Sequence, residues 1–424
     1  MVRDHGHPPA GRRDVSEPSS LPRDPLYGWI LVAIVFTLST LSFGALGAVS
    51  VFLKPLAAEF GWGRGETAFG YTAIAFSAAL FGVLWGVIAD RFGTRWFGIV
   101  AAVAMTVSLL LLSQQDSIIE FYTFYFLFGA LGNALTSAPL FANVGFWFQR
   151  RPGLALGITA AGGAFGQGVV PYLAGMGIEA WGWRETYEVM AWTYLVIALP
   201  IALFIRESPG RLAAQSDAVV IRADTGVSDW EVVGWISVAV IFCCNCMAVP
   251  IVHLVPLLTD NGMPVADATR VLMVLMFAGV AGRIFGGQLG DRIGALPAYM
   301  LMSLGQTVFV LWFPHVSGML SLYALAVAFG FTYSGVMSSI LVTTRQMVSA
   351  RLGARAMSLT SFFGWMGMGM GGFVGGLLYD QTGAYGWSYG WASAAGVINL
   401  IVLGCFWMRI QSRRSHPTPV TQSR

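Results

Sequence analysis

One arginine stands alone in an apolar, glycine-rich stretch of the chain. The segment "MFAGVAGRIFGG" covers residues 276–287, and Arg283 is the only charged residue between Val271 and Gly290. Twenty residues is about the length that an α-helix needs to cross the hydrocarbon core of a bilayer. A charge at the centre of such a helix costs about 2.5–3.5 kcal/mol and almost always faces the protein interior or a wet cavity. Arg283 therefore predicts a buried polar site.

The sequence places no acidic partner near Arg283. All the acidic residues fall in tails, loops or helix ends, and the deepest, Glu188, lies near a helix end remote from the level of Arg283. A planar guanidinium binds a carboxylate through two parallel hydrogen bonds. We therefore expect Arg283 to bind a substrate carboxylate, the alternative being a cation held by backbone carbonyls or aromatic faces. A single fixed charge favours monoanions, because a dicarboxylate would leave one charge unpaired.

The composition is that of an integral membrane protein. Of the 424 residues 56% are hydrophobic and only 11% are charged, against about 25% charged in an ordinary soluble domain. The 52 glycines suit helices that pack closely in lipid. Three of the four cysteines form "CCNC" at 243–246, and we expect them to pack rather than to bind metal or form disulfides. We expect no catalytic centre, metal, cofactor or nucleic-acid partner, so the chain is not expected to be an enzyme.

Twelve apolar segments are long enough to span a bilayer, and a polar stretch divides them into six plus six. They lie near residues 29–52, 68–88, 96–113, 119–143, 153–176, 186–205, 232–257, 268–289, 297–314, 318–343, 354–378 and 387–408. The predicted fold is an all-α membrane protein with two six-helix bundles, which matches the internal repeats of secondary transporters. The predicted parts are a disordered tail (1–28), a first bundle (29–205), a linker (206–231), a second bundle (232–409) and a tail (410–424).

Basic residues indicate the orientation of these spans. Most of the 24 Lys and Arg residues fall in the two tails, the linker and the alternate loops on the same side. Basic loops mark the cytoplasmic side of a membrane protein. We therefore expect a multi-pass protein of a bacterial inner membrane type, with both termini and the linker in the cytoplasm. We expect it to function as a monomer.

A charged motif recurs in the two halves. "GVIADRFGTR" at 86–95 is echoed by "GQLGDRIG" at 287–294. The first resembles the loop 2–3 signature of the major facilitator superfamily, which implies a latch on the cytoplasmic side during alternating access. The alternative is a charged turn that only sets topology. The residues concerned are Gly86, Asp90, Arg91, Gly93 and Arg95 in the first copy and Gly287, Asp291, Arg292 and Gly294 in the second.

A second stretch resembles the signature of the monocarboxylate transporter family before and within its fifth helix. "WFQRRPGLALGITAAGGAFG" at 147–166 matches that pattern at Phe148, Arg151, Leu154, Ala155, Gly157, Ala161, Gly162 and Gly166. The chain departs from it at Trp147, Arg150 and Thr159. "YGWILV" at 27–32 and "VFLKPLAAEF" at 51–60 resemble the family's first helix and the segment with its lysine.

The resemblance implies a role for Arg283. In that family an arginine of helix 8, eight residues before an acidic or amide position of the next turn, grips the substrate carboxylate; Arg283 stands eight before Asp291. Members similar to the mammalian lactate carriers have a coupling aspartate four residues before that arginine, where this chain has Gly279. The related oxalate and formate exchangers carry a lysine on helix 11, whereas residues 357–378 hold no base.

Other residues are candidates to complete the site. His253 could donate a hydrogen bond to the substrate or carry a proton; a histidine bonded to a neighbouring helix is the equal alternative. Lys54, matching the family lysine, is the candidate entry point for protons and anions, with snorkelling as the alternative. Because helices 1, 4, 7 and 10 surround the path in this fold, candidates for the cavity wall, or else for packing, are Tyr122, Tyr125, Tyr333, Ser361, Phe362 and Trp365.

These expectations define a function and its rivals. The chain is predicted to be a secondary active transporter of small organic monocarboxylates similar to lactate, pyruvate or acetate, coupled to protons and working by alternating access. The first alternative is a carboxylate exchanger of the oxalate and formate type, because the sequence does not identify a coupling group. A drug efflux carrier would favour an acidic cavity. A non-transporting sensor would usually need a longer tail or an extra domain.

Overall fold

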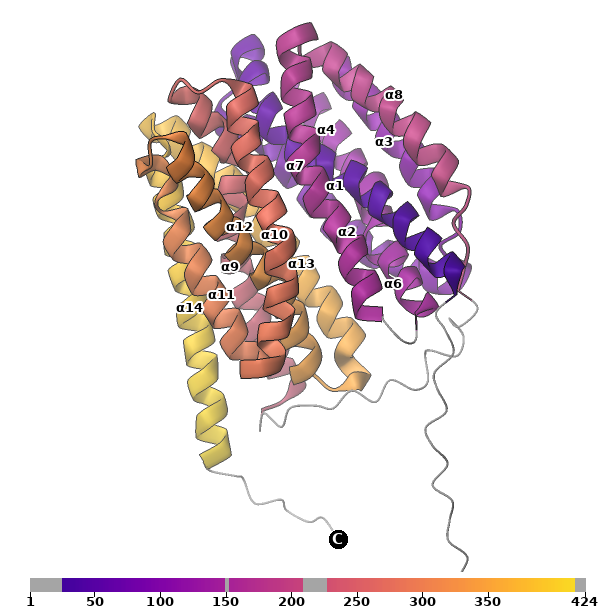
Figure 1. The fold of residues 1–424 in the computed structure, drawn as a ribbon, viewed down its shortest axis with the longest axis vertical. Helices are drawn as coiled ribbons and strands as arrows, with labels where there is room; N and C mark the ends of the chain where they lie inside the picture. The colour runs from indigo at the N-terminus through magenta and orange to yellow at the C-terminus, as the bar shows by residue number, and fades with distance from the viewer. Residues whose placement is uncertain (1–24, 149–151, 209–226, 416–424) are drawn as a thin grey trace, which may run out of the picture.

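The computed structural model describes residues 25–148, 152–208 and 227–415, and all regular structure in these ranges is helical. Figure 1 shows two groups of long helices that lie side by side. The first group contains α1 (Leu26–Phe60), α2 (Arg64–Phe92), α3 (Phe97–Ser113), α4 (Ile118–Leu127), η1 (Phe128–Asn133), α5 (Ala134–Thr136), α6 (Ala138–Trp147), α7 (Pro152–Trp181) and α8 (Trp183–Ala202). The second contains α9 (Asp229–Asp260), α10 (Val265–Ile293), α11 (Ala295–Val310), η2 (Phe313–His315), α12 (Met319–Met347), α13 (Ala350–Thr382) and α14 (Tyr385–Ser415).

Nine helical segments of the described residues are long and apolar enough to cross a membrane. Helices suit that solvent because they satisfy every backbone hydrogen bond within one segment. Helix α9 is the most enclosed of them, with 83% of its apolar window buried inside the protein. It therefore runs through the centre of the molecule. Helices α3, α8 and α13 are not among these nine segments.

The predicted span 119–143 is interrupted rather than continuous. Between α4 and α5 the chain forms the π-helical segment η1, and Ser137 separates α5 from α6. A π segment shifts the backbone hydrogen bonds by one residue. Trp85 of α2 donates its indole Nε1–H to the Ala130 carbonyl at 2.8 Å within this segment. The hydropathy pattern could not reveal the break, because the segment remains apolar throughout.

Turn glycines repeat with the spacing of the two halves. Gly61, Gly93 and Gly182 have positive φ angles, and Gly262, Gly294 and Gly383 have positive φ angles 201 residues later. Positive φ strains residues that carry a Cβ, so glycine is favoured at each of these helix ends. The matching turns support an internal repeat of a six-helix unit.

We call the end of the molecule where α1 begins and α2 ends the linker end, and the other the opposite end. Helix α2 contacts α13 of the second half from Arg64, near the opposite end, to Ala75. Thr72 donates to the Gly369 carbonyl at 2.7 Å within this contact. Further toward the linker end, no described atom would meet a Cβ at Gly82 or Gly86 within 4 Å. The two helices therefore separate toward the linker end.

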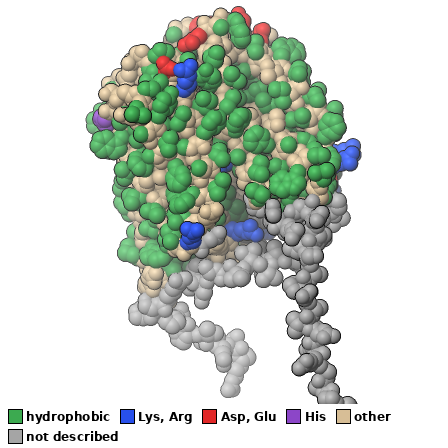
Figure 2. All heavy atoms as spheres, in the orientation of Figure 1, with side chains coloured by type: hydrophobic (Ala, Val, Ile, Leu, Met, Phe, Trp, Pro, Cys, Tyr) green, Lys and Arg blue, Asp and Glu red, His purple; other side chains and the backbone are tan. Residues whose placement is uncertain are grey.

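Helices α7 and α10 also pack together at the opposite end and separate toward the linker end. They pack tightly near the opposite end, where a Cβ at Gly175 would lie 2.9 Å from Val265. Toward the linker end, a Cβ at Gly157 or Gly287 would meet no atom of the described residues within 4 Å. The halves thus touch at the opposite end and diverge toward the linker end, and Figure 2 shows a hollow between them there.

Candidate functional site

Arg283 lies where the two halves part. Its Nη1 on α10 donates to the Ala160 carbonyl of α7 at 3.0 Å, across the boundary between the halves. Closer to the opposite end, Phe165 of α7 stacks on Phe277 of α10 with ring centroids 5.7 Å apart. Beyond Arg283 toward the linker end come the open positions on both helices. Arg283 therefore stands at the vertex of the opening between the halves.

The guanidinium of Arg283 is only partly satisfied. Its Nε atom is buried and has no hydrogen-bond partner among the described residues. The ion pairs found within the described ranges include none to Arg283. The Tyr333 hydroxyl of α12 lies close enough to interact with the guanidinium. A buried donor without a partner costs about 1–3 kcal/mol, so the site has capacity for a ligand that accepts hydrogen bonds.

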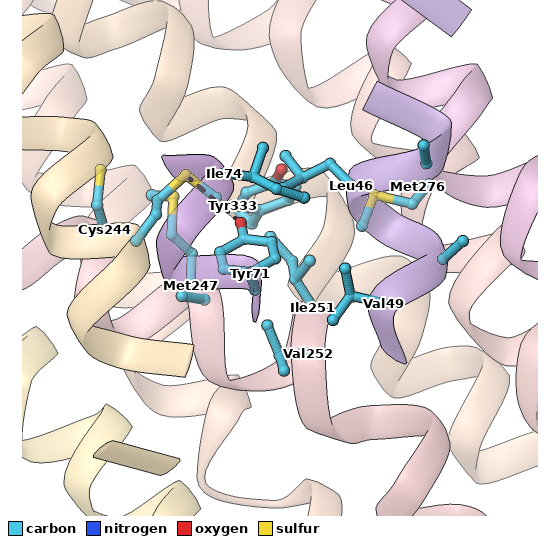
Figure 3. Close-up of a cluster of buried hydrophobic side chains, with 14 of the residues drawn as sticks. Leu46, Val49, Tyr71, Ile74, Cys244, Met247, Ile251, Val252, Met276 and Tyr333 are labelled. Atoms are coloured by element: carbon cyan, nitrogen blue, oxygen red, sulfur yellow. Dashed lines mark hydrogen bonds between the residues drawn. The ribbon is translucent and has the colours of Figure 1, made fainter. Parts of the chain in front are cut away.

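A cluster of buried, mainly apolar side chains lies between the two halves. It consists of side chains from both halves, and Figure 3 shows Tyr333 and Tyr71 within it. All its labelled members are almost fully buried. We define the central plug as Leu46, Val49, Tyr71, Ile74, Cys244, Met247, Ile251, Val252, Met276 and Tyr333. Tyr333 belongs to this plug, and its hydroxyl also lies close to Arg283.

The residues predicted to line the cavity wall lie in different parts of the structure. Trp365 of α13 stacks against Phe43 of α1 with centroids 6.0 Å apart, so these rings bridge the halves. Trp365 and Tyr122 also line a groove of about 580 Å³ between α2, α4 and α13. Tyr122 donates to the Glu66 carbonyl at 2.9 Å. Ser361 is exposed on α13.

His253 of α9 lies apart from Arg283 and is buried against α13. Its Nε2 lies 2.7 Å from the Gly372 carbonyl, and its ring is 5.4 Å from Tyr385. Because a carbonyl only accepts, Nε2 carries the proton and a neutral ring leaves Nδ1 as an acceptor. That Nδ1 has no partner among the described residues. The bond to a neighbouring helix is the structural alternative that the sequence left open.

Lys54 takes part in a network at the opposite end that the sequence did not predict. Its Nζ lies 2.8 Å from Oδ1 of Asp260 in the second half. Arg64 pairs with the same carboxylate. Arg64 and Asp260 stand at helix ends and looked like ordinary loop charges in the sequence, whereas Lys54, the predicted entry point, lies six residues before the end of α1. Only the pairing of α1 and α2 with α9 reveals their connection.

The repeated loop motif lies at the linker end. Gly93 and Gly294 form the two equivalent turns, with φ angles of 84° and 95°. Arg91, Arg95 and Arg292 are exposed, and Arg91 lies over the Phe92 ring at 5.3 Å. Arg95 lines a cavity of about 380 Å³ together with Arg206 and Glu207. The side chains of Asp90 and Asp291 lie outside the described set. The cytoplasmic contact predicted between Asp90 and Arg91 therefore stays a prediction.

The glycine signature of the fifth predicted helix packs α7 against α1. A Cβ at Gly162 would lie 2.3 Å from the Phe36 carbonyl, and one at Gly166 would lie 2.0 Å from that of Thr40. The Thr40 hydroxyl donates to the Gly162 carbonyl at 3.1 Å. These contacts hold the helix that supplies Ala160 to Arg283. Arg151, the other signature residue, lies outside the described residues.

A family model and several known proteins match the chain. The model of the Major Facilitator Superfamily matches residues 34–320 and 234–423. Monocarboxylate transporter 13 of Rattus norvegicus is 26% identical over 93% of both chains. Monocarboxylate transporter 2 of Mesocricetus auratus is 23% identical over 91% of this chain and 84% of that protein. Riboflavin transporter RibJ of Trypanosoma brucei brucei is 29% identical, over 44% of this chain and only 35% of its own length.

Solved structures share the fold. The nucleoside transporter NupG, in a mutant form, superposes with a TM-score of 0.70 at 13% identity, covering 90% of this chain and 99% of that one. A bacterial homologue of the human lysosomal transporter Spinster, described as inward-facing and unoccupied, superposes with a TM-score of 0.68 at 16% identity. That match covers 93% of this chain and 99% of the other.

Proposed function

The chain belongs to the Major Facilitator Superfamily, and from that premise we propose that it carries small organic monocarboxylates across a cell membrane by alternating access. The family makes it a membrane transporter and not an enzyme. The substrate class, the coupling to protons, the twelve spans and the monomeric state are our proposals. We also propose a bacterial inner membrane setting with the linker end in the cytoplasm, as the basic loops indicate.

One observation carries the substrate proposal. Arg283 stands at the vertex of the opening with one N–H bonded to a backbone carbonyl and a buried Nε that has no partner in the described ranges. A carboxylate would accept from Nε and a neighbouring N–H in the parallel geometry that a guanidinium favours. The Tyr333 hydroxyl, which faces the same guanidinium, would supply a further donor. The similarity to monocarboxylate transporters along most of both chains favours the same class.

The single positive charge of Arg283 narrows the class of substrate. Positions 357–378 of α13 hold no basic side chain, so this part of α13 offers no cation for a second carboxylate. An unpaired carboxylate in a low-dielectric site is costly. Monocarboxylates are therefore preferred over oxalate. Riboflavin, which RibJ is named for, is uncharged and would leave the guanidinium without a counter-ion.

A transport assay tests this proposal. The purified protein is reconstituted into proteoliposomes, and uptake of labelled lactate, pyruvate, acetate, formate, oxalate and riboflavin is measured with and without a pH gradient. We expect uptake of at least one monocarboxylate, and loss of that uptake in Arg283→Gln. Arg270→Gln is the matched control, because Arg270 pairs at 2.7 Å with Asp267 of its own helix. Full monocarboxylate uptake by Arg283→Gln, or uptake of riboflavin alone, would overturn the proposal.

A further inference from the structure

A charge network joins the two halves at the opposite end. Asp260, the last residue of α9, accepts from Lys54 of α1 at 2.8 Å and from Nη2 of Arg64 at 3.0 Å. The same Arg64, at the start of α2, donates Nη1 to the hydroxyl of Tyr385 on α14 at 2.7 Å. One carboxylate of the second half therefore holds two cations of the first. We call Lys54, Arg64, Asp260, Asp380 and Tyr385 the latch.

Asp380 extends the latch to the backbone of α2. Its two carboxylate oxygens accept from the backbone N–H groups of Arg64 and Gly65 at 2.8 and 2.7 Å. Asp380 thereby caps a helix of the other half, where unpaired N–H groups and the helix dipole favour an anion. The ring of Tyr379 lies 4.0 Å from the Arg64 guanidinium carbon. The groups that face Asp260 thus come from α1, α2, α13 and α14.

The internal repeat shows that this connection is peculiar to the second half. In the first half, Glu59 at the end of α1 pairs with Arg184 of α8 at 3.1 Å, so its cation comes from the same half. The positions 201 residues later are Asp260 and Tyr385. Tyrosine carries no positive charge, so Asp260 has no cation at the equivalent position of its own half. Its two cationic partners come instead from across the boundary.

The latch is enclosed but within reach of water. The side chains of Arg64, Asp260 and Lys54 are 14%, 23% and 37% exposed. Partial burial strengthens the attraction between their charges relative to bulk water. Contact with solvent lets a proton reach the carboxylate from the opposite end. An ionisable carboxylate that holds the two halves together is therefore placed where external pH can act on it.

We propose that Asp260 is the proton-binding residue that couples opening of the opposite end to external pH. This inference rests on the proposed function, because it names the coupling group of that transport cycle. Ionised, Asp260 holds Lys54 and Arg64 against the second half. A proton taken from water removes its charge, releases both cations and lets α1 and α2 move away from α9. The freed cations then face an incoming anion, and the proton leaves when Asp260 pairs with them again.

His253 lies behind the latch on the same helix. It stands seven residues before Asp260, about 10 Å deeper along α9, and its ring is 5.4 Å from that of Tyr385. His253 therefore occupies the inner side of the network, whereas Asp260 occupies the side that solvent reaches first. The proposal assigns the proton to Asp260.

Distances between spin labels test the latch directly. Labels are attached at Ala58→Cys and Ala384→Cys, which are exposed positions of the two halves at the opposite end, in a Cys405→Ser background. Because a carboxylate beside two cations takes up a proton only at or below the ordinary aspartate range near pH 4, we expect the population with a long distance to grow as the pH falls from about 5 to about 3. One proton sets the limit at about tenfold per pH unit, because the open state binds one more proton than the closed state. Asp260→Asn should give the long distance at every pH.

Control variants keep the outcome decisive. Asp267→Asn removes an acid at the same end whose partner, Arg270, is on its own helix, and it should respond to pH as the parent protein does. Lys54→Gln combined with Arg64→Gln should give the long distance at every pH, even if Asp260→Asn fails to fold. The proposal is wrong if the parent distances ignore pH, if Asp260→Asn keeps the parent response, or if the double variant keeps it.

The same samples separate this inference from the proposed function. Exchange of labelled monocarboxylate at equal pH on both sides reports carboxylate transport and needs no proton gradient. A parent protein that exchanges no monocarboxylate contradicts the proposed function, while the spin-label distances still decide the latch. Loss of the stimulation of uptake by a pH gradient in Asp260→Asn is the result that we expect for the latch.

Discussion

At the scale of single residues, the candidate site holds a positive charge whose hydrogen-bond donors are only partly paired. Arg283 makes one hydrogen bond to a backbone carbonyl and keeps a buried Nε without a partner in the described part of the chain. Tyr333 belongs to the central plug, and its hydroxyl lies close to this charge. A ligand at Arg283 would thus meet a charged donor and a neutral donor at the closed end of the opening.

Tyr333→Phe tests the neutral donor. Loss of one hydroxyl donor removes about 0.5–1.5 kcal/mol of binding, so we expect the KM for monocarboxylate uptake to rise roughly 2- to 12-fold. Tyr125→Phe is the matched control, because the Tyr125 hydroxyl pairs at 2.7 Å with that of Tyr187 inside the first half. The control should lower the unfolding temperature and leave the KM unchanged. An equal KM for Tyr333→Phe and the parent would exclude Tyr333 from the substrate site.

The sequence identified some of these residues and missed others for physical reasons. Arg283 could be found because a lone charge in a long apolar run is costly wherever the helix lies. The Ala160 carbonyl could not be found, because a backbone group leaves no signal in residue type. The pairing of Arg64 with Asp260 joins residues 196 positions apart. Such a pair becomes visible only when the helices are placed.

At the scale of helices, α7 supports the site through its glycines. Gly162 and Gly166 bring α7 against the backbone of α1, while Gly157 of the same helix faces open space. Close approach through small residues is a common means of helix association in lipid. The packed part of α7 includes the level of Phe165, and Ala160 lies between it and the open part. The helix therefore fixes the carbonyl that Arg283 contacts.

Two alanine substitutions in α7 compare these environments. Gly166→Ala places a Cβ where the Thr40 carbonyl oxygen would lie 2.0 Å away, so α7 must shift from α1. Overpacking of this kind costs about 1–3 kcal/mol, and we expect a lower unfolding temperature in detergent. Gly157→Ala meets nothing within 4 Å in the part of the chain that the structure describes and should be neutral or stabilising, because alanine is the better helix former. Equal destabilisation by both substitutions would contradict the packing described for α7.

Helix positions were more predictable than helix details. Each apolar segment that the sequence indicated lies in a helical region of the structure, and the repeated charged motif marks two equivalent turns. The π segment within the fourth predicted span gave no signal, because hydropathy does not distinguish hydrogen-bond registers. Helix α1 extends to Phe60, beyond the predicted end near residue 52, because its helical hydrogen bonds continue past the length needed to cross a bilayer.

At the scale of the whole molecule, the two halves close at one end and part at the other. The latch closes the opposite end, the central plug lies between the halves, and Arg283 marks the point where α7 and α10 separate. Composition and the internal repeat indicated two halves, but not which end they would open. In an alternating-access cycle the closed contacts must break, so a charged latch that a proton can release suits that end. The account thus rests on a carboxylate bound at the vertex.

Binding of a carboxylate and of its amide to the purified protein tests that central claim most directly. The best substrate of the uptake panel and its uncharged amide are titrated against the parent, Arg283→Gln and the control Arg270→Gln, and Kd is obtained from ligand-induced stabilisation. A charge-assisted hydrogen bond contributes about 1.5–3 kcal/mol. We therefore expect the parent and the control to prefer the carboxylate by about tenfold or more, and Arg283→Gln to lose that preference. Equal discrimination by Arg283→Gln and the parent would contradict a substrate carboxylate at Arg283.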